Sequence, residues 1–183
     1  MVERPEPELV YSWQGPPSLE LWREPVVLPS GLEYTGHRLV ASGGRPGVVV
    51  LAHRDGRMLF VRSLRPAVGR VILELPRGFG EADPADPDGP VSDALRELRE
   101  ETGYSARAIR VRGEYTADTS ILPSRVAVVE CAVDPGDPAG TDGEVIDAEW
   151  LPQRQIRALV TDGILADAHT LSALMLAPDL WNG

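Results

Sequence analysis

Three carboxylates lie at positions i, i+3 and i+4 of one short charged stretch: Glu97, Glu100 and Glu101. If this stretch is helical, the three side chains fall within about 100° of one another around the helix axis. Like charges on one face repel, which weakens a helix unless a counter-charge is present. Carboxylate oxygens are the ligands that Mg²⁺ and Mn²⁺ prefer. The spacing therefore predicts a site for Mg²⁺ or Mn²⁺ on one helix face, and the alternative is a solvated acidic face.

The helix that would carry these carboxylates also has an apolar stripe. Pro90 suits the first turn of a helix, and Gly103 suits the left-handed residue that ends one. Between them, apolar residues recur at helical spacing: Val91, Ala94, Leu95 and Leu98. This pattern predicts a helix of about three turns that packs its apolar stripe against a sheet.

The segment ahead of the helix, Leu73–Gly78, has the pattern of a strand that ends in a Pro/Gly turn. Strand, glycine loop and acidic helix together resemble the Nudix box, whose family pattern is G-x5-E-x7-R-E-U-x-E-E-x-G-U, with U an aliphatic residue. The second half matches at every fixed position from Arg96 to Gly103, and Tyr104 fills the final hydrophobic position. The first half is four residues longer than the pattern, and either Asp88 or Glu81 stands for its first glutamate.

Outside the box, the chain resembles the ADP-ribose pyrophosphatase branch of the Nudix family from about Val26 to Ala177. Individually weak matches follow one another in the order and spacing of that branch: Val27–Gly31 at its N-terminal hairpin turn, Ser63–Pro66 at its Q-[YF]-R position, Glu74–Gly78 at its ELPAG strand, and Gly163–Leu171 at its G-x-I-x-D-x-x-T helix start. The resemblance implies a Nudix fold and a Mg²⁺-dependent (or Mn²⁺-dependent) hydrolase.

The resemblance also implies roles for particular residues. Glu97 and Glu101 would be the main metal ligands, Glu100 would complete the cluster and act with Glu97 in catalysis, and the backbone carbonyl of Arg77 would be a further ligand. Arg65 would bind a substrate phosphate. The identity of the physiological metal stays open at this point.

In the same branch, a glutamate on a late mobile loop orients or deprotonates the attacking water. Glu144, in a loop of Asp and Gly residues, occupies the corresponding position. Asp142 and Glu149 are its nearest competitors for that role. A solvated loop residue is the alternative interpretation of Glu144.

The composition restricts the classes of partner. A net charge of −10 disfavours nucleic acid as a main partner. All basic residues are arginines, so no lysine is available for Schiff-base chemistry. The single cysteine, Cys131, excludes an internal disulfide framework and fits a reducing compartment. Because no apolar run reaches membrane-spanning length, we expect a cytoplasmic protein without a membrane partner.

Strands alternating with a few helices predict an α/β fold, namely a Nudix-type α/β/α sandwich with a mixed sheet. We expect residues 43–183 to form the Nudix domain and residues 1–42 to form a small N-terminal β appendage. The appendage would contain a hairpin and too little apolar mass to fold alone. In the resembling branch this hairpin packs onto the partner subunit across a two-fold axis, which implies a homodimer. The resemblance also implies that Trp22 or Tyr34 stacks on the base of the substrate, and which of the two does so stays open.

The implied activity is hydrolysis of the pyrophosphate bond in a nucleoside diphosphate linked to another moiety, with ADP-ribose or a related nucleotide sugar as the small-molecule substrate. Thr119 stands where the ADP-ribose branch has a proline, which weakens the assignment to ADP-ribose itself. The alternatives are a Nudix hydrolase acting on a dinucleoside polyphosphate or another sugar nucleotide, and a Nudix-fold nucleotide-binding or regulatory module without turnover.

Overall fold

A computed structural model describes residues 6–83 and 85–181 of the chain. It contains two compact units, which we call unit 1 (the described part of Met1–Arg45, with Thr116–Arg125) and unit 2 (Pro46–Tyr115 with the described part of Val126–Gly183). The strands are β1 Glu8–Trp13, β2 Leu19–Val27, β3 Glu33–Ala41, β4 Gly47–Arg54, β5 Arg57–Arg65, β6 Arg70–Glu74, β7 Arg77–Phe79, β8 Ala106–Thr116, β9 Arg125–Val133 and β10 Asp147–Pro152. The helices are α1 Gly89–Thr102, α2 Gln153–Thr161 and α3 Ala168–Leu176, with short 3-10 turns at Ser42–Gly44 and Pro178–Leu180.

The centre of unit 2 is a mixed sheet with the strand order β10-β5-β4-β9-β8. Strand β4 pairs in parallel with β9 and antiparallel with β5. Its run Val48–Ala52 is at most 2% exposed, because neighbouring strands flank it and helices cover both faces. The continuous apolar sequence of β4 predicted this burial, and the prediction is confirmed.

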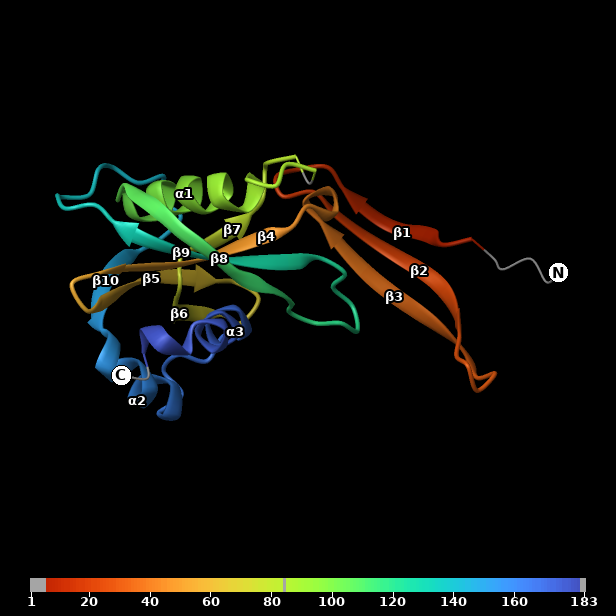
Figure 1. The fold of residues 1–183 in the computed structure, drawn as a ribbon. Coiled ribbons are helices and arrows are strands. Elements are labelled where there is room, and N and C mark those ends of the chain that lie inside the picture. The colour runs from red at the N-terminus through yellow and green to blue at the C-terminus, as the bar shows by residue number, and fades with distance from the viewer. Residues whose placement is uncertain (1–5, 84, 182–183) are drawn as a thin grey trace. The chain divides into compact units, whose positions relative to one another are not determined.

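Helices cover the two faces of this sheet (Figure 1). Helix α1 packs Ala94 and Leu98 against one face, with Leu59 and Val129 of the sheet. Helices α2 and α3 cover the other face, where their buried side chains meet a separate apolar cluster: Ile156, Ala173 and Leu174 with Leu51, Phe60 and Val128. The predicted three-layer α/β/α arrangement with a mixed sheet is confirmed.

Strands β4 and β5 separate soon after their shared turn. They pair only at His53–Arg54 with Arg57–Met58. Beyond this point β6 pairs with β5 and β7 pairs with β4, so that the chain changes partner strand at Leu75 and Pro76. The sequence analysis predicted β6 and a loop after it, and it did not predict β7. This separation brings the Gly78 segment against the sheet beneath α1.

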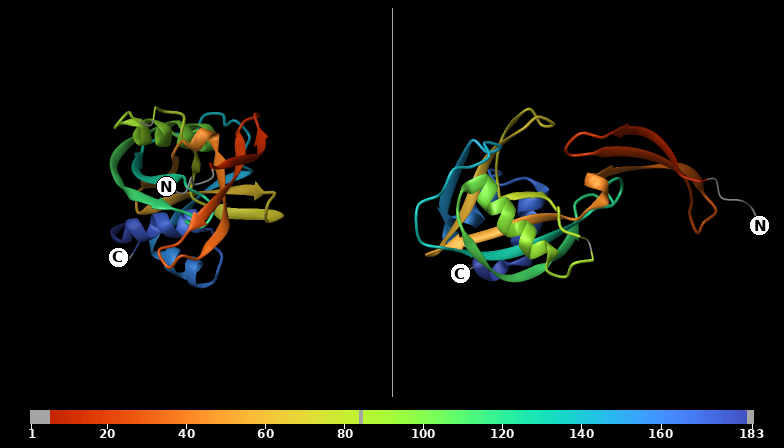
Figure 2. Two further views of the ribbon diagram at one scale, coloured as in Figure 1. Left: turned by 90° about the vertical axis from the view of Figure 1, so that its right-hand side faces the viewer. Right: turned by 90° about the horizontal axis from the view of Figure 1, so that it is seen from above.

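Unit 1 contains a three-stranded antiparallel sheet in the order β1-β2-β3, seen from two further sides in Figure 2. The hairpin of β2 and β3, with its turn after Val27, was predicted, and β1 was not predicted. The loop 116–125 joins this unit through a hydrogen bond from Leu39 N–H to the carbonyl of Ile121, 2.8 Å long. No residue between 6 and 45 is buried in the described chain. Within the described part of unit 1, no α-helix or second sheet covers the apolar side chains of this sheet.

The expected boundary between residues 42 and 43 stays a prediction, to which the structure adds that residues 116–125 group with unit 1. Among the described residues, no helix combines the length and the apolar character that crossing a lipid bilayer requires.

Candidate functional site

The acidic face of α1 is turned toward the interior at two of its three glutamates. Glu97 is 9% exposed and Glu101 is 5% exposed, whereas the side chain of Glu100 is 44% exposed. The helix ends as predicted, with Gly103 in the left-handed region at φ 71° and its N–H bonded to the carbonyl of Arg99. Two carboxylates one helical turn apart are thus buried, which is rare for glutamate.

Glu97 lies directly against the backbone of the glycine loop. A Cβ atom placed on Gly78 would come within 2.1 Å of the Glu97 carboxylate, so any other residue here would force the end of the Glu97 side chain to move. Close approach therefore favours glycine at this position, and its φ is not unusual. The resemblance to the Nudix box identified this glycine, and the structure gives the physical reason for it.

Arg96 holds together the polar groups around Glu97. Its guanidinium donates to Glu97 Oε1 at 2.9 Å, to Glu100 Oε2 at 2.7 Å and to the carbonyl of Phe79 at 2.9 Å. The same guanidinium lies 3.4 Å from buried Asp93, a residue that the sequence analysis did not single out. Because Arg96 is bonded to two of the three glutamates, it offsets part of their mutual repulsion.

The two candidates for the first glutamate of the box take different places. Glu81 Oε2 lies 3.8 Å from Arg96 Nε, while its backbone N–H donates to Asp93 Oδ1 at 2.9 Å. Asp88 precedes α1, and its carbonyl accepts the first helical hydrogen bonds from Val91 and Ser92. Of the two, Glu81 is the one in contact with the arginine of the box.

Glu101 faces the neighbouring strand β7. Its Oε2 accepts the backbone N–H of Arg77 at 3.0 Å. Burial raises the pKa of Glu101 to about 8, against the opposing effect of that hydrogen bond, and the charge of Glu97 raises it further. For Glu97, burial likewise raises the pKa, although Arg96 opposes it, and the charges of Glu100 and Glu144 add to the rise. Neither carboxylate therefore ionises as readily as an exposed glutamate, and a bound cation would favour the ionised form of both.

A fourth carboxylate, Glu74, lies fully buried beside Glu101 at the end of β6. Arg65 binds its Oε1 at 2.6–2.7 Å, and Arg77 binds its Oε2 at 3.1–3.2 Å. Arg65 was predicted to bind a substrate phosphate, and Glu74 had no predicted role. A charged residue that follows the apolar run of β6 was the signal that could have identified it. Glu74 therefore fixes the side chains of both arginines beside Glu101.

Glu144 lies on an exposed loop that is tied to α1 and to β5. On one side, Asp142 N–H donates to the carbonyl of Glu100 at 3.0 Å; on the other, Ile146 N–H donates to the carbonyl of Arg62 at 2.8 Å. The charge of Glu144 is close enough to act on Glu97. Of the competing carboxylates, Asp142 accepts the N–H of Glu144 at 2.9 Å, and Glu149 is ion-paired with Arg62 at 2.6 Å.

The donor set suits a divalent cation held jointly by protein and substrate. Within residues 6–83 and 85–181, no three His, Cys, Asp or Glu side chains are grouped so that they could hold a metal ion by themselves. Mg²⁺ is nevertheless commonly bound by one or two carboxylates with water and substrate phosphates. Glu97 and Glu101 supply two buried carboxylates, and the Arg77 carbonyl belongs to the segment that contacts Glu101. Glu100 is bonded to Arg96, as Glu97 is, and differs from the other two in being largely exposed.

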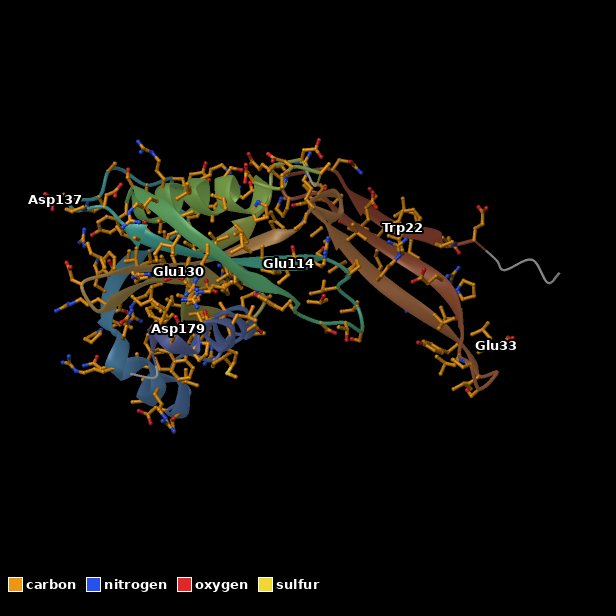
Figure 3. The ribbon with its side chains drawn as sticks, in the orientation of Figure 1. Trp22, Glu33, Glu114, Glu130, Asp137 and Asp179 are labelled. Atoms are coloured by element: carbon orange, nitrogen blue, oxygen red, sulfur yellow. The ribbon has the colours of Figure 1, made fainter. Side chains whose placement is uncertain are left out.

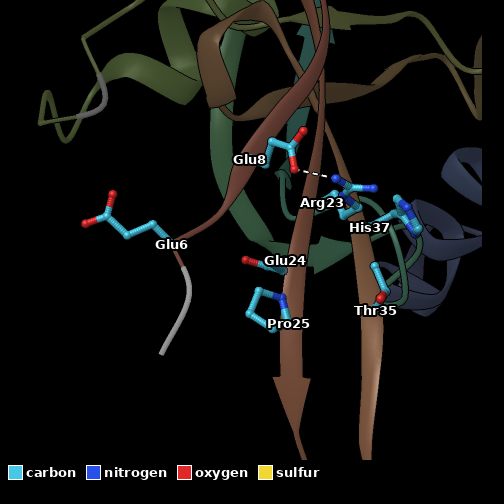
Figure 4. A pocket seen from close by; sticks show the side chains of 7 residues that line it. All are labelled: Glu6, Glu8, Arg23, Glu24, Pro25, Thr35 and His37. Carbon is cyan, nitrogen blue, oxygen red and sulfur yellow. Dashed lines mark hydrogen bonds and ion pairs between the residues drawn. The ribbon is translucent and has the colours of Figure 1, made fainter. Parts of the chain in front are cut away.

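The two aromatic candidates both belong to unit 1. Trp22 is half-buried; its indole N–H donates to Glu20 at 2.8 Å, and the guanidinium of Arg38 lies 5.1 Å from its ring centroid. Tyr34 is 52% exposed near the hairpin turn. The same sheet contains an open hollow of about 400 Å³ (Figure 4). Its lining has three carboxylates and one arginine, a charge balance that does not suit an anionic substrate: Glu6, Glu8, Arg23, Glu24, Pro25, Thr35 and His37.

A second charged cluster in the structure has a structural role. Buried Glu130 accepts hydrogen bonds from His53, Arg110 and Arg112 at 2.7–3.0 Å, and Asp179 accepts from both arginines. Glu130 and Asp179 are labelled in Figure 3. Burial opposes ionisation of Glu130, but these three partners outweigh it and lower its pKa. The cluster ties the C-terminal turn to β8, and its charges are satisfied internally.

The fold is that of a Nudix domain, and the comparisons with known proteins agree. The NUDIX domain family matches residues 44–174, which is more than half of the chain. The chain therefore belongs to the Nudix family. Along its whole length it also has the fold of a solved structure described as an ADP compounds hydrolase, with a TM-score of 0.72 and 19% identity, covering 98% of that chain.

Curated relatives carry related names. The chain is 31% identical over 120 residues to an ADP-sugar pyrophosphatase of Mus musculus, covering 61% of this chain and 52% of the relative. It is 36% identical over 101 residues to an ADP-ribose pyrophosphatase of Bacillus subtilis, covering 54% of this chain and 51% of the relative. The matched region thus spans about half the length of these relatives.

Proposed function

We propose that this protein is a Mg²⁺-dependent pyrophosphohydrolase that cleaves the phosphoanhydride of a nucleoside diphosphate linked to another moiety, with ADP-ribose or a related nucleotide sugar as substrate. The observation that carries this proposal is the pair of buried carboxylates, Glu97 and Glu101, one helical turn apart on α1 and packed against the segment of Arg77 and Gly78. The names of the relatives support ADP-ribose and ADP-sugars as the substrate class.

In the proposed reaction, Glu97, Glu101 and the Arg77 carbonyl would hold the metal, with Glu100 completing the cluster, and the bound metal would supply neutralisation of phosphate charge and a more acidic water. Glu144 orients the attacking water and accepts its proton. The water oxygen forms a bond to one phosphorus as the bridging P–O bond breaks, which yields two phosphate monoesters. Arg65, fixed by Glu74 at 2.6 Å and still one-third exposed, has further N–H groups for a phosphate oxygen.

A homodimer belongs to the same proposal. Unit 1 buries no residue between 6 and 45, and it exposes aromatic and aliphatic side chains that a partner would cover: Leu9, Tyr11, Trp13 and Tyr34. In an isologous dimer, unit 1 of each subunit would bring Trp22 or Tyr34 to the substrate base of its partner. A cytoplasmic location is also proposed, because the thiol of Cys131 is buried and the chain has no second cysteine to pair with it.

Thr119 stands where the ADP-ribose branch has a proline. This difference favours a second candidate function, hydrolysis of a dinucleoside polyphosphate or of another sugar nucleotide. A Mg²⁺-dependent assay over a panel of ADP-ribose, other nucleotide sugars and dinucleoside polyphosphates, with coupled phosphatase to release phosphate, tests the proposal. The expected result is metal-dependent hydrolysis with ADP-ribose or an ADP-sugar among the best substrates. Preference for dinucleoside polyphosphates would select the second candidate, and nucleotide binding without hydrolysis would identify a non-catalytic module.

A further inference from the structure

The segment between β6 and β7 leaves one buried backbone group without a strand partner. Strand β6 pairs with β5 and strand β7 pairs with β4, and Leu75 lies between these two strands in the chain. Leu75 is fully buried. Its N–H donates to Oγ1 of Thr170 at 3.0 Å, across 95 positions of sequence. Thr170 is also fully buried. A buried N–H needs a partner, and here helix α3, on the face opposite α1, supplies it.

The Thr170 hydroxyl is itself held in a fixed place. Asp167 caps α3, and its Oδ1 accepts the backbone N–H of Thr170 at 3.0 Å. One turn further on, Ala173 and Leu174 anchor the helix in the apolar cluster beneath the sheet. On the adjacent residue, Nδ1 of His169 is hydrogen-bonded to the hydroxyl of Tyr115 at 2.6 Å. The first turn of α3 therefore presents the hydroxyl from a rigid support.

The two residues after Leu75 are fixed in the same way by other elements. Val50 N–H of β4 donates to the carbonyl of Pro76 at 2.9 Å, and Arg77 N–H donates to Glu101 of α1 at 3.0 Å. Three successive residues are thus held by α3, β4 and α1 in turn. The last of them carries the backbone carbonyl of the proposed metal site.

We propose that Thr170 is a positioning residue for the metal site: its hydroxyl fixes Leu75 and, through it, the placement of the Arg77 carbonyl relative to Glu101. This inference rests on the proposed function, because it assigns Thr170 a part in that same site. Residues outside the ligand set that orient the ligands commonly change metal affinity by about 10- to 100-fold when they are replaced. A hydroxyl that served only the stability of α3 would leave metal affinity unchanged.

The test measures Mn²⁺ affinity of the full chain without substrate, by electron paramagnetic resonance titration, at a temperature where every variant is folded. Thr170→Val keeps the shape of the side chain and removes the acceptor, so we expect affinity to fall by about 10-fold. Thr170→Ser keeps the hydroxyl and is expected to restore affinity to within about threefold of wild type. Thr161→Val is the matched control, because that hydroxyl donates to the carbonyl of Arg157 in its own helix, at 2.9 Å, and bonds to no other residue that the structure describes.

Equal Mn²⁺ affinity in wild type and in folded Thr170→Val would overturn the inference and leave the proposed function standing. A wild-type protein that binds no Mn²⁺ would overturn both. Should Thr170→Val fail to fold, Asp167→Ala decides, since it loosens the turn that carries the hydroxyl without removing the acceptor. Weakened Mn²⁺ binding in Asp167→Ala supports the inference, and unchanged binding overturns it.

Discussion

Glu97 and Gly78 are in such close contact that the carboxylate occupies the place where any other residue at position 78 would have its Cβ, 2.1 Å away. The contact joins α1 to the strand that pairs with β4. It also makes the position of the carboxylate sensitive to a single methyl group, which provides a direct test of the site.

Gly78→Ala should displace Glu97 and lower kcat by about 10²-fold or more, since a displacement of about 1 Å in a reacting group has an effect of this size. Gly140→Ala is the matched control: a Cβ at Gly140 meets nothing within 4 Å, and its φ is not in the left-handed region. Steady-state kinetics of both variants on the best substrate of the panel make the comparison. Full activity in Gly78→Ala would contradict the assignment of Glu97 to the site.

Glu97→Gln should abolish turnover while the fold is kept, because the amide still accepts a hydrogen bond from Arg96 but no longer binds a divalent cation well. Removing one of several like charges also relieves repulsion on the helix face. Thermal unfolding with and without Mg²⁺ should show that the ligand-dependent rise in Tm is lost in the variant. Asp137→Asn, in an exposed loop, is the control. Near-wild-type activity in Glu97→Gln contradicts the assignment.

Glu144→Gln should lower kcat by about 10²-fold or more with little change in KM, if this glutamate acts as general base. The competing carboxylates are tested in the same assay by Asp142→Asn and Glu149→Gln. Because Glu149 is paired with Arg62 at 2.6 Å, its replacement should affect stability more than kcat. A larger loss of kcat in either competitor would transfer the role to that residue.

His169 should make the stability of the protein dependent on pH in mildly acidic solution. Burial lowers its pKa below the usual value of 6.5, and the charge of Arg77 lowers it further. The unfolded chain therefore binds a proton at a pH where the folded chain does not, so the stabilisation present above pH 6.5 is lost as the pH falls through the folded-state pKa. Urea unfolding between pH 7 and pH 5 should show a steeper fall in the free energy of unfolding for wild type than for His169→Gln. Equal slopes would mean that His169 accepts its proton freely in the folded state.

Full-length protein should be a dimer by light scattering, whereas a chain that starts at Gly43 should be monomeric and less active. The physical reason is the uncovered sheet of unit 1, in which Trp13 is 57% exposed and Tyr34 is 52% exposed. In a second measurement, Trp22→Ala and Tyr34→Ala should raise KM if stacking contributes about 1–3 kcal/mol to binding of the base. A monomeric full-length protein, or a truncated chain that stays dimeric and fully active, would contradict the proposed assembly.

Local sequence predicted those elements whose signals are themselves local. The apolar stripe, Pro90 and Gly103 predicted α1 almost to the residue, because helical hydrogen bonds join residues four apart. The continuous apolar run of β4 predicted a strand buried on both faces, and its core residues are fully buried. The resemblance to the Nudix box placed Glu97 and Glu101 together, and the structure buries both of them.

The tertiary structure decided which partners these residues meet. Strand β7 was not predicted, because a three-residue strand has little pattern of its own and is defined by its pairing with β4, about 30 positions earlier. Strand β1 was not predicted either, although it pairs with β2, the next strand along the chain. Glu74 with Arg65, Leu75 with Thr170, and Ile146 with Arg62 are contacts across 9, 95 and 84 positions respectively, and only folding brings them together. The sequence by itself thus determined the acidic helix and the chemistry of its carboxylates. Their burial, their raised pKa values and their contact with Gly78 depend on the layers that enclose them, because solvent exclusion is a property of the packed fold.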